Sequence, residues 1–370
     1  MGRQRFKPNR SDSFFGEFVY EQVLPKDHFL VQLRAIVPWE RFTDKLIKCY
    51  KGGARLGRPP YDPVVVLKML LLSYLYNVSE RQVEEMCNLN LAAKYFLGLG
   101  IDERPPDHTT LTALKKRILA NGNLGVFEAL LRDVIALAVE KGIKFGEVQV
   151  VDSTHSIADV NVGKDKKKRK RGQRVRDPLA DWGVKSSRKV RDGDGRERVV
   201  KRQFFGYKAH ASLNAETGLI TSLVHTPGNA YDGHELCRLV ERDLAQDLPV
   251  HIVAADRGYD SGANHYWLQE KGMYSAICLN RYRTEKKDEN KRIWVEMKRT
   301  EEYKRGQKER YKIERKFGEA KQGHGLGRCR YVGLVRYAIQ GFLTAIALNL
   351  KRLVMLLTAV PFKGRARVLA

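Results

Sequence analysis

Residues 205–225 read FGYKAHASLNAETGLITSLVH, and this stretch decides the fold class. Every second residue from Phe205 to Leu213 is apolar, and most of the residues between them are polar. This alternation predicts a strand at 204–213 with one buried face. A turn-forming run at 214–218 separates it from a second apolar run at 219–225, so we expect an antiparallel β-hairpin.

Short apolar runs on both sides of the hairpin predict further strands of the same sheet. Residues 148–152 form one such run, which ends in Asp152, and residues 250–255 form another, which is followed by Asp256. The elements expected beyond them are a helix at 263–271 and a strand at 274–279. The order strand, hairpin, helix, strand, helix, strand predicts a mixed α/β sheet with helices packed against it.

The first part of the chain has helical periodicity instead. Apolar segments between residues 14 and 137 are separated by Gly-rich and Pro-rich turns, which predicts an all-α domain over 1–145. Asp107 is expected to cap a helix that carries Lys115, Lys116 and Arg117. These short helices fit a helix-turn-helix-like DNA reader, and they fit an ordinary helical bundle with a solvated basic face equally well.

The rest of the chain is expected to divide into an α/β domain over 146–334 and a C-terminal part over 335–370. The C-terminal part holds an apolar helix and a basic tail. Two inserts interrupt the α/β domain, a basic one at 160–203 and a charged one at 280–308.

Local patterns predict the conformation of three segments. Nine of the thirteen residues in 164–176 are Lys or Arg, and such a run is expected to stay flexible until it binds a partner. A charged helix is expected at 309–321. Asp232 and Glu235 stand three residues apart before an apolar helical run, so they resemble a capping box.

Composition narrows the class of protein. The 370 residues include 68 Lys and Arg against 43 Asp and Glu, a formal net charge of +25, which favours nucleic acid as the partner. The five cysteines are scattered without a Cys-x-x-Cys pair, which argues against disulfides and structural zinc. No leader or lipidation signal is present, and the apolar stretches 64–76 and 342–360 are interrupted by polar or charged residues. We therefore expect a cytoplasmic protein that makes no contact with a membrane.

Three acidic residues could carry chemistry. Asp152 and Asp256 follow buried strands, where ligands bind in open α/β sheets, and Glu314 lies on the charged helix. Together they could hold two divalent cations for phosphodiester chemistry, and carboxylate oxygens suit Mg²⁺, with Mn²⁺ as a substitute. Each acid alone could be a cap or a surface residue, but the set in so basic a chain favours the metal site.

Several stretches, in order along the chain, carry a family resemblance. In the helical part they are FFGEFVYEQVLPKDHFL (14–30), GRPPYDPVVVLKMLLLSYL (57–75), SERQVEE (79–85) and PDHTTLTALKKR (106–117). In the α/β part they are VVDSTHS (150–156), FGYKAHASLNAETGLITSLVHTPGNAYD (205–232), AADRGYDS (254–261) and ERYKIERKFGEAKQGHGLGRCRY (309–331). Together they resemble bacterial insertion-sequence transposases of the DDE type, whose catalytic core has a ribonuclease-H-like fold.

The resemblance implies that Asp152, Asp256 and Glu314 are the catalytic, metal-holding triad. Many members of the family carry Tyr-x2-Arg-x3-Glu-x6-Lys on the glutamate helix. Arg310, Glu314 and Lys321 match this motif, but Gln307 stands at the Tyr position.

The activity implied is that of a DNA transposase that binds terminal inverted repeats, cleaves at the ends and joins the 3′-hydroxyls to target DNA. A nucleoid-associated homodimer in a synaptic complex on double-stranded DNA is also implied. The expected DNA-binding residues are Arg310, Lys321, Lys208, Lys166, Lys167, Lys168, Arg169, Lys170, Arg171, Lys115, Lys116 and Arg117. The alternatives are an inactive or domesticated DNA-binding regulator and a metal-dependent nuclease without joining activity.

Helical spacing selects Glu314 among the acids of its helix. At about 100° per residue, Glu314 shares a face with Arg310. Glu319 points nearly the opposite way, and Glu309 lies roughly 100° from Arg310 on the other flank. Glu319 is expected to pair with a neighbouring base, Arg315 or Lys316.

Overall fold

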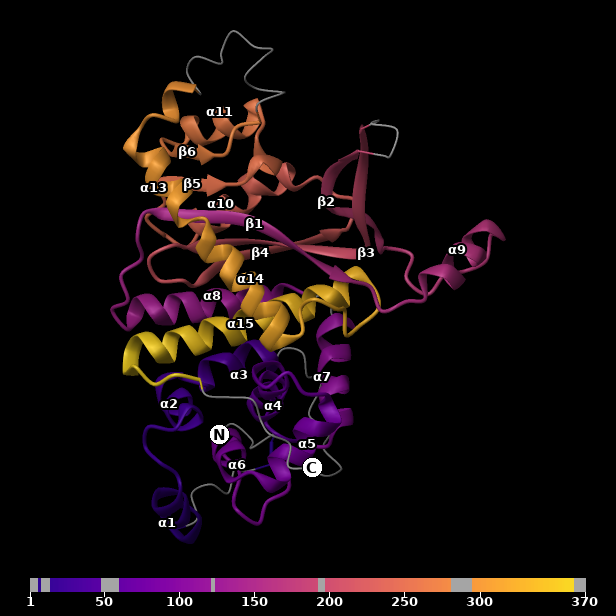
Figure 1. Cartoon of the computed structure of the whole chain (residues 1–370). Coiled ribbons are helices and arrows are strands. Elements are labelled where there is room, and N and C mark those ends of the chain that lie inside the picture. The colour runs from indigo at the N-terminus through magenta and orange to yellow at the C-terminus, as the bar shows by residue number, and fades with distance from the viewer. Residues whose placement is uncertain are drawn as a thin grey trace. The chain divides into compact units, whose positions relative to one another are not determined.

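The computed structural model describes residues 6–7, 14–47, 60–120, 124–191, 197–280 and 295–362 (Figure 1). The chain forms two compact units. Residues 1–141 and 346–370 make up the helical unit, and residues 142–345 make up the sheet unit.

The helical unit is organised around one buried helix. Its helices are α1 (Phe14–Val23), α2 (Phe29–Ile36), α3 (Glu40–Ile47), α4 (Pro63–Leu75), α5 (Glu80–Leu89), α6 (Leu91–Leu97), α7 (His108–Ala120) and α8 (Gly125–Glu140). Every residue of α4 is buried, and α3, α5, α6 and α7 pack against it. Because α4 carries apolar residues on all its sides, with Lys68 as its one charged residue, it can be stable only inside such a bundle. The helical N-terminal region is as predicted.

Side-chain caps fix where two of these helices begin. Ser79 accepts a hydrogen bond from the Gln82 N–H, and the Gln82 side chain accepts one from the Ser79 N–H, so α5 starts with a capping box. Asp107 Oδ1 accepts from the Thr109 N–H at 2.6 Å, which confirms Asp107 as the predicted cap of α7.

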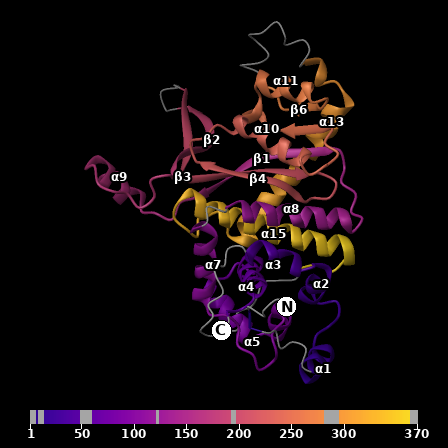
Figure 2. The same cartoon turned by 180° about the vertical axis from the view of Figure 1, so that it is seen from behind.

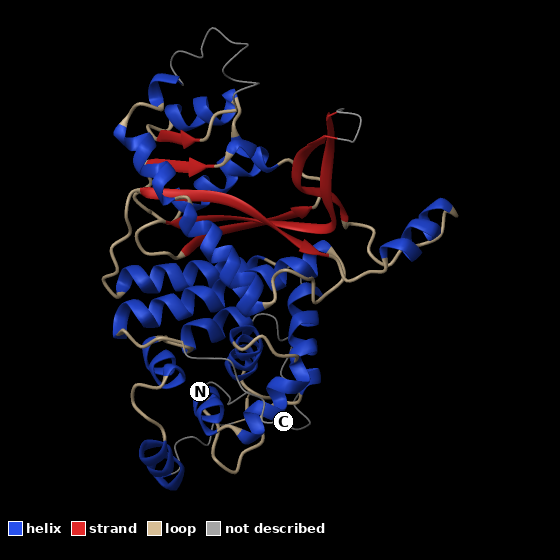
Figure 3. Cartoon of the chain, viewed as in Figure 1, coloured by secondary structure: helices blue, strands red, loops and turns tan. Residues whose placement is uncertain are grey.

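The described strands of the second unit form one mixed sheet (Figure 3). They are β1 (Val148–Ile157), β2 (Asp181–Arg191), β3 (Glu197–Asn214), β4 (Ile220–Pro227), β5 (Ile252–Ala255) and β6 (Tyr274–Ile277). The order is β2-β3-β1-β5-β6, and β4 also pairs with β3. β1 is antiparallel to β3 and parallel to β5, so a mixed α/β sheet flanked by helices is confirmed.

Helices cover both faces of this sheet. The helices that follow β1 are α9 (Val162–Lys170), α10 (Leu236–Leu244), α11 (Gly262–Glu270), α13 (Glu301–Glu309), α14 (Tyr311–His324) and α15 (Leu334–Thr358), with short 3₁₀ turns η1 (Asp232–Glu235) and η2 (Arg257–Tyr259). Of these, α9 projects away from the sheet (Figure 1), and residues 346–358 of α15 belong to the helical unit. Val151 and Val253 pack in one cluster with Leu239 and Leu268 of α10 and α11. The alternate residue Ala254 faces Gly306 of α13 on the other side, where a Cβ would lie 3.4 Å from Ala254 and 2.5 Å from Ala276. Gly306 therefore lets α13 lie directly on β5 and β6.

The run at 164–176 was expected to stay flexible, but residues 164–170 of it lie in a helix, and the rest of the basic insert contributes strands. Residues 162–170 form α9, and β2 pairs with the first half of β3, which begins seven residues before the predicted strand. The two strands form a ribbon that rises from the rest of the sheet (Figure 2). Backbone pairing needs no apolar side chains, so a polar, basic sequence gave no strand signal.

Two further predictions need correction, and one lies partly outside the described residues. Asp232 makes no capping bond: η1 has Tyr231 at its N-cap position and no side-chain cap. The charged helix expected at 309–321 is α14, which begins at Tyr311 and ends at His324, whereas Glu309 is the last residue of α13. Of the charged insert, residues 281–294 lie outside the described part, and residues 301–309 form α13.

The apolar C-terminal helix α15 is mostly a core element. By length and composition it could cross a membrane, but 67% of its most apolar window is buried inside the protein. Near its start, the Tyr337 ring stacks on Tyr207 of β3 at 5.1 Å, and the Tyr337 hydroxyl lies 2.8 Å from Ser156 Oγ of β1. These contacts are typical of the core helix of a globular protein.

Candidate functional site

The pairing of two parallel strands brings two aspartates together. Val151 of β1 is in register with Ala255 of β5, so the next residues, Asp152 and Asp256, occupy neighbouring positions where β5 ends. Parallel strands lie about 4.8 Å apart, and the carboxyl ends of such strands are the usual ligand sites of open α/β sheets. These residues are 104 positions apart in sequence and adjacent in space.

Each of these carboxylates has one oxygen held by the backbone. Asp152 Oδ1 accepts from the Ser153 N–H at 2.7 Å, and Asp256 Oδ1 accepts from the Gly258 N–H at 2.8 Å. Burial raises the pKa of Asp152 to about 7, helped by repulsion from Asp256 and opposed by the Ser153 N–H. Burial also raises the pKa of Asp256. Two carboxylates that repel each other in a desolvated site favour a cation between them.

Arg310 supplies a cation beside both aspartates. Its charge lowers the pKa of Asp152 and of Asp256, against the effect of burial. The guanidinium Nη2 lies 3.5 Å from Glu314 Oε1, one turn further along α14. Glu314 is 61% exposed, and its charge raises the pKa of Asp256. Arg310 therefore links the exposed glutamate to the two partly buried aspartates.

Gln307 contacts the same arginine as Glu314, but its amide nitrogen binds the sheet. Its side-chain amide donates hydrogen bonds to the backbone carbonyls of Ala255, at 3.3 Å, and of Ala276. Its Oε1 lies 3.5 Å from Arg310 Nη1. At the family's usual Tyr position, this chain therefore has an amide that binds the ends of β5 and β6.

A second cationic group lines the site on the β1 side. Lys321 Nζ of α14 lies 3.5 Å from His155 Nδ1, and the His155 ring packs on Phe204 at 4.7 Å. Burial, together with the charges of Lys321, Lys185 and Lys208, lowers the pKa of His155 to about 4. The imidazole is therefore neutral at physiological pH, and the positive charge stays on the lysines.

Sequence reasoning missed Asp232 as a member of this site. Its Oδ1 lies 2.8 Å from Lys208 Nζ, and its Oδ2 accepts from Ser153 Oγ at 2.9 Å. Its charge raises the pKa of both Asp152 and Asp256. One signal for this role was available, its place in the stretch 205–232 that carries the family resemblance. Its spacing to Glu235 pointed to a helix cap instead.

The oxygens of the site suit a hard cation. Among the described residues, the hydrogen bonds of Asp152 and Asp256 engage only the Oδ1 atoms, so both Oδ2 atoms remain for a ligand. Carboxylate oxygens are the ligands that Mg²⁺ and Mn²⁺ prefer. Asp152, Asp256 and Glu314 therefore fit a divalent cation by their chemistry, although their oxygens are not all within 4.8 Å of one another.

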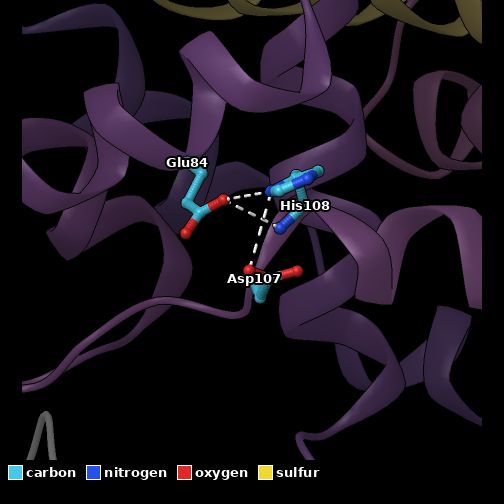
Figure 4. Close-up of side chains that lie close together, drawn as sticks. All are labelled: Glu84, Asp107 and His108. Atoms are coloured by element: carbon cyan, nitrogen blue, oxygen red, sulfur yellow. Dashed lines mark hydrogen bonds and ion pairs between the residues drawn. The ribbon is translucent and has the colours of Figure 1, made fainter.

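A tighter group of possible ligands lies in the helical unit (Figure 4). Glu84 Oε2 accepts from the His108 N–H at 3.0 Å and lies 2.6 Å from His108 Nδ1, while Asp107 Oδ2 is 3.6 Å from the same nitrogen. Since Asp107 also accepts from the Thr109 N–H, these acids satisfy the free N–H groups at the start of α7. The group is explained as a helix cap that joins α5 to α7.

The remaining predicted DNA-binding residues differ in exposure. Residues 166–170 of α9 and its C-cap residue, Arg171, are all exposed. Lys116 and Arg117 are exposed on α7, whereas Lys115 is buried and pairs with Glu80 of α5. Lys208 is also largely buried, with its ammonium on Asp232 and on the Ala230 carbonyl at 2.8 Å each.

Comparison with known families gives two matches. Residues 144–350, more than half of the chain, match the family model described as a transposase DDE domain. Residues 18–117 match the model described as a transposase domain (DUF772).

Proposed function

The chain belongs to the DDE transposase family, and on this premise we propose that it cleaves the ends of an insertion element and joins them to target DNA. Asp152, Asp256 and Glu314 are the proposed catalytic carboxylates. The register of β1 with β5 carries this proposal, because it sets two aspartates side by side next to Arg310.

Both proposed reactions are in-line phosphoryl transfers at one site. In cleavage, a water oxygen bonds to the phosphorus while the bond to the 3′-oxygen breaks, and the 3′-hydroxyl is freed. In joining, that 3′-hydroxyl bonds to a target phosphorus, and the target's own 3′-oxygen leaves. Transposases of this family use divalent metal ions, and Mg²⁺ bound here would activate the attacking oxygen and stabilise the leaving one.

The residues around the carboxylates would hold the DNA. Arg310 and Lys321 flank Asp152 and are the proposed phosphate contacts beside the scissile bond. The exposed bases at 166–171 would add affinity for the backbone of any duplex. Their attraction is electrostatic and carries no sequence information.

The parts of the chain would divide the work. We assign inverted-repeat recognition to residues 1–145 and catalysis to residues 146–334. Residues 335–370 hold the closing apolar helix and the basic tail. Because two element ends must be processed together, we propose a homodimer in the synaptic complex, acting on DNA in the cytoplasm at the nucleoid.

Replacing one metal-holding aspartate tests the proposal. Asp152→Asn and Asp256→Asn should abolish cleavage and joining on inverted-repeat DNA in Mg²⁺ while leaving end binding intact, because the amide removes a ligand charge and keeps the side-chain shape. Asp247→Asn is the matched control, since Asp247 is exposed and Asn tolerates its left-handed backbone (φ 55°). Full activity of Asp152→Asn, or of the parent in a chelator, would refute the proposal.

A further inference from the structure

Asp232 is held at the catalytic site by three elements that lie far apart in sequence. It begins η1, 79 residues after Ser153 and 24 residues after Lys208, and it touches both side chains. The Lys208 ammonium also donates to the Ala230 carbonyl at 2.8 Å, two residues before Asp232. Lys208 therefore fixes both the carboxylate and the turn that carries it.

Ser153 links this carboxylate to the proposed ligand Asp152. Its backbone N–H donates to Asp152 Oδ1, and its hydroxyl donates to Asp232 Oδ2. One residue thus bridges two carboxylates through different atoms. A bond that holds the Ser153 side chain also restrains the backbone from which Asp152 projects.

A buried amide links the Asp232 turn to the Asp256 turn. Asn264 of α11 is 5% exposed, and its Nδ2 donates to the Gly233 carbonyl at 3.0 Å and to the Tyr259 carbonyl at 2.8 Å. Gly233 follows Asp232, and Tyr259 belongs to η2, whose cap is Asp256. The connections therefore run from Asp152 through Ser153 and Asp232 to the turn of Asp256.

The local charges balance without a further ligand. His210 Nδ1 is 3.9 Å from Asp232 Oδ1, but His210 is fully buried, and burial lowers its pKa to about 4, so it is neutral. Among the described residues, Lys208 is the charged partner of Asp232. With Lys208 on one oxygen and Ser153 on the other, Asp232 is arranged to hold its neighbours in place.

We propose that Asp232 is a positioning residue of the catalytic centre, which fixes the spacing of Asp152 and Asp256 through Ser153, with Lys208 as its counter-ion. This inference rests on the proposed function of the two aspartates. It assigns Lys208 to this network in place of the direct DNA contact expected from the sequence.

The test measures metal binding directly, as well as cleavage. Free Mn²⁺ is measured by electron paramagnetic resonance in titrations of the full-length protein, and cleavage is measured on inverted-repeat DNA. Asp232→Asn should weaken Mn²⁺ binding and cleavage by about 10-fold to 100-fold, the range seen when residues that orient metal ligands are replaced. DNA binding in a gel-shift assay should not change.

A serine series separates positioning from folding. Ser153→Ala removes the hydroxyl and should weaken Mn²⁺ binding about tenfold, whereas Ser153→Thr keeps the hydroxyl and should restore it. Asp232→Asn with Ser153→Ala should be no worse than Asp232→Asn alone, because both remove the same link. Glu235→Gln, on the same turn but paired with Arg238 at 3.7 Å, is the matched control and should behave as the parent.

The outcomes distinguish this inference from the proposed function. Parent-like Mn²⁺ binding and cleavage by Asp232→Asn, with Asp152→Asn inactive, would overturn the positioning role alone. Equal losses in Ser153→Ala and Ser153→Thr would also overturn it. An active Asp152→Asn would overturn the proposed function instead.

Discussion

Lys68 is a buried cation whose replacement should stabilise the protein. It lies in α4 and is 6% exposed, with its ammonium 4.9 Å from the centre of the Trp39 ring and 5.6 Å from that of Phe96. Burial lowers the pKa of Lys68 to about 7, and repulsion from Arg34 adds to the shift. The aromatic faces only partly replace the water that surrounds an exposed ammonium.

The size of the effect follows from the difference in proton binding. The unfolded chain keeps Lys68 protonated up to its ordinary pKa of 10.5, whereas the folded chain releases the proton near pH 7. The folded state therefore binds fewer protons in this window, and its stability rises with pH between 7 and 10.5. The cost of burying Lys68 is about 5 kcal/mol at pH 6 and about 1 kcal/mol at pH 10.

Lys68→Met keeps the length of the side chain and removes its charge. Its free energy of unfolding should exceed that of the parent by up to about 5 kcal/mol at pH 6, with the gain shrinking towards pH 10. Urea unfolding followed by circular dichroism measures the total, and hydrogen exchange of residues 63–75 reports on α4 itself. Lys116→Met, at an exposed site of α7, should change little. A gain that is absent at pH 6, or equal at pH 6 and pH 10, would refute the reasoning.

Four other variants have defined expectations. Glu314→Gln should abolish strand cleavage in Mg²⁺, whereas Glu319→Gln should retain most of it, because Glu319 pairs with Lys316 at 3.2 Å; the reverse result on the same DNA ends would contradict the assignment. Replacing the six bases at 166–171 by Gln should weaken binding to all duplexes alike. The slope of log K, where K is the DNA association constant, against the logarithm of the salt concentration should become shallower by up to about 0.9 for each phosphate that is no longer neutralised. A weakening confined to inverted-repeat DNA would contradict this. Burial raises the pKa of Asp243 to about 7, so the folded state binds the extra proton and loses stability as pH rises from about 4 to 7; Asp243→Asn should remove this slope in urea unfolding at pH 5 and pH 8, and an unchanged slope would exclude Asp243 as its cause.

The sequence predicted those parts of the fold whose signals are local. The alternation from Phe205 to Leu213 marked a strand, but the expectation of a single buried face was wrong, because the polar residues His210 and Ser212 are as fully buried as their apolar neighbours. The apolar runs before Asp152 and Asp256 marked β1 and β5, because helices cover both faces of β5. Asp107 was predictable as a cap, since capping depends on residues only two positions away.

Signals that depend on distant partners were missed. β2 is held by backbone bonds to β3, and its polar residues gave no apolar pattern. Asp232 looked like a helix cap until its contacts with Ser153 and Lys208 were known. Gln307 binds the carbonyls at the ends of two strands, an environment that helical spacing cannot show.

The end of β1 depends on a segment far along the chain, which has a consequence for protein synthesis. Ile157 donates to the Gly327 carbonyl at 3.0 Å and accepts from the Cys329 N–H at 2.8 Å. Glu314 and Lys321 lie just before this segment. A ribosome must therefore add about 170 residues after β1 before the end of this strand can complete its hydrogen bonds. On the proposed function, a product that ends before Glu314 would carry Asp152 and Asp256 without the third carboxylate, so it should not cleave DNA.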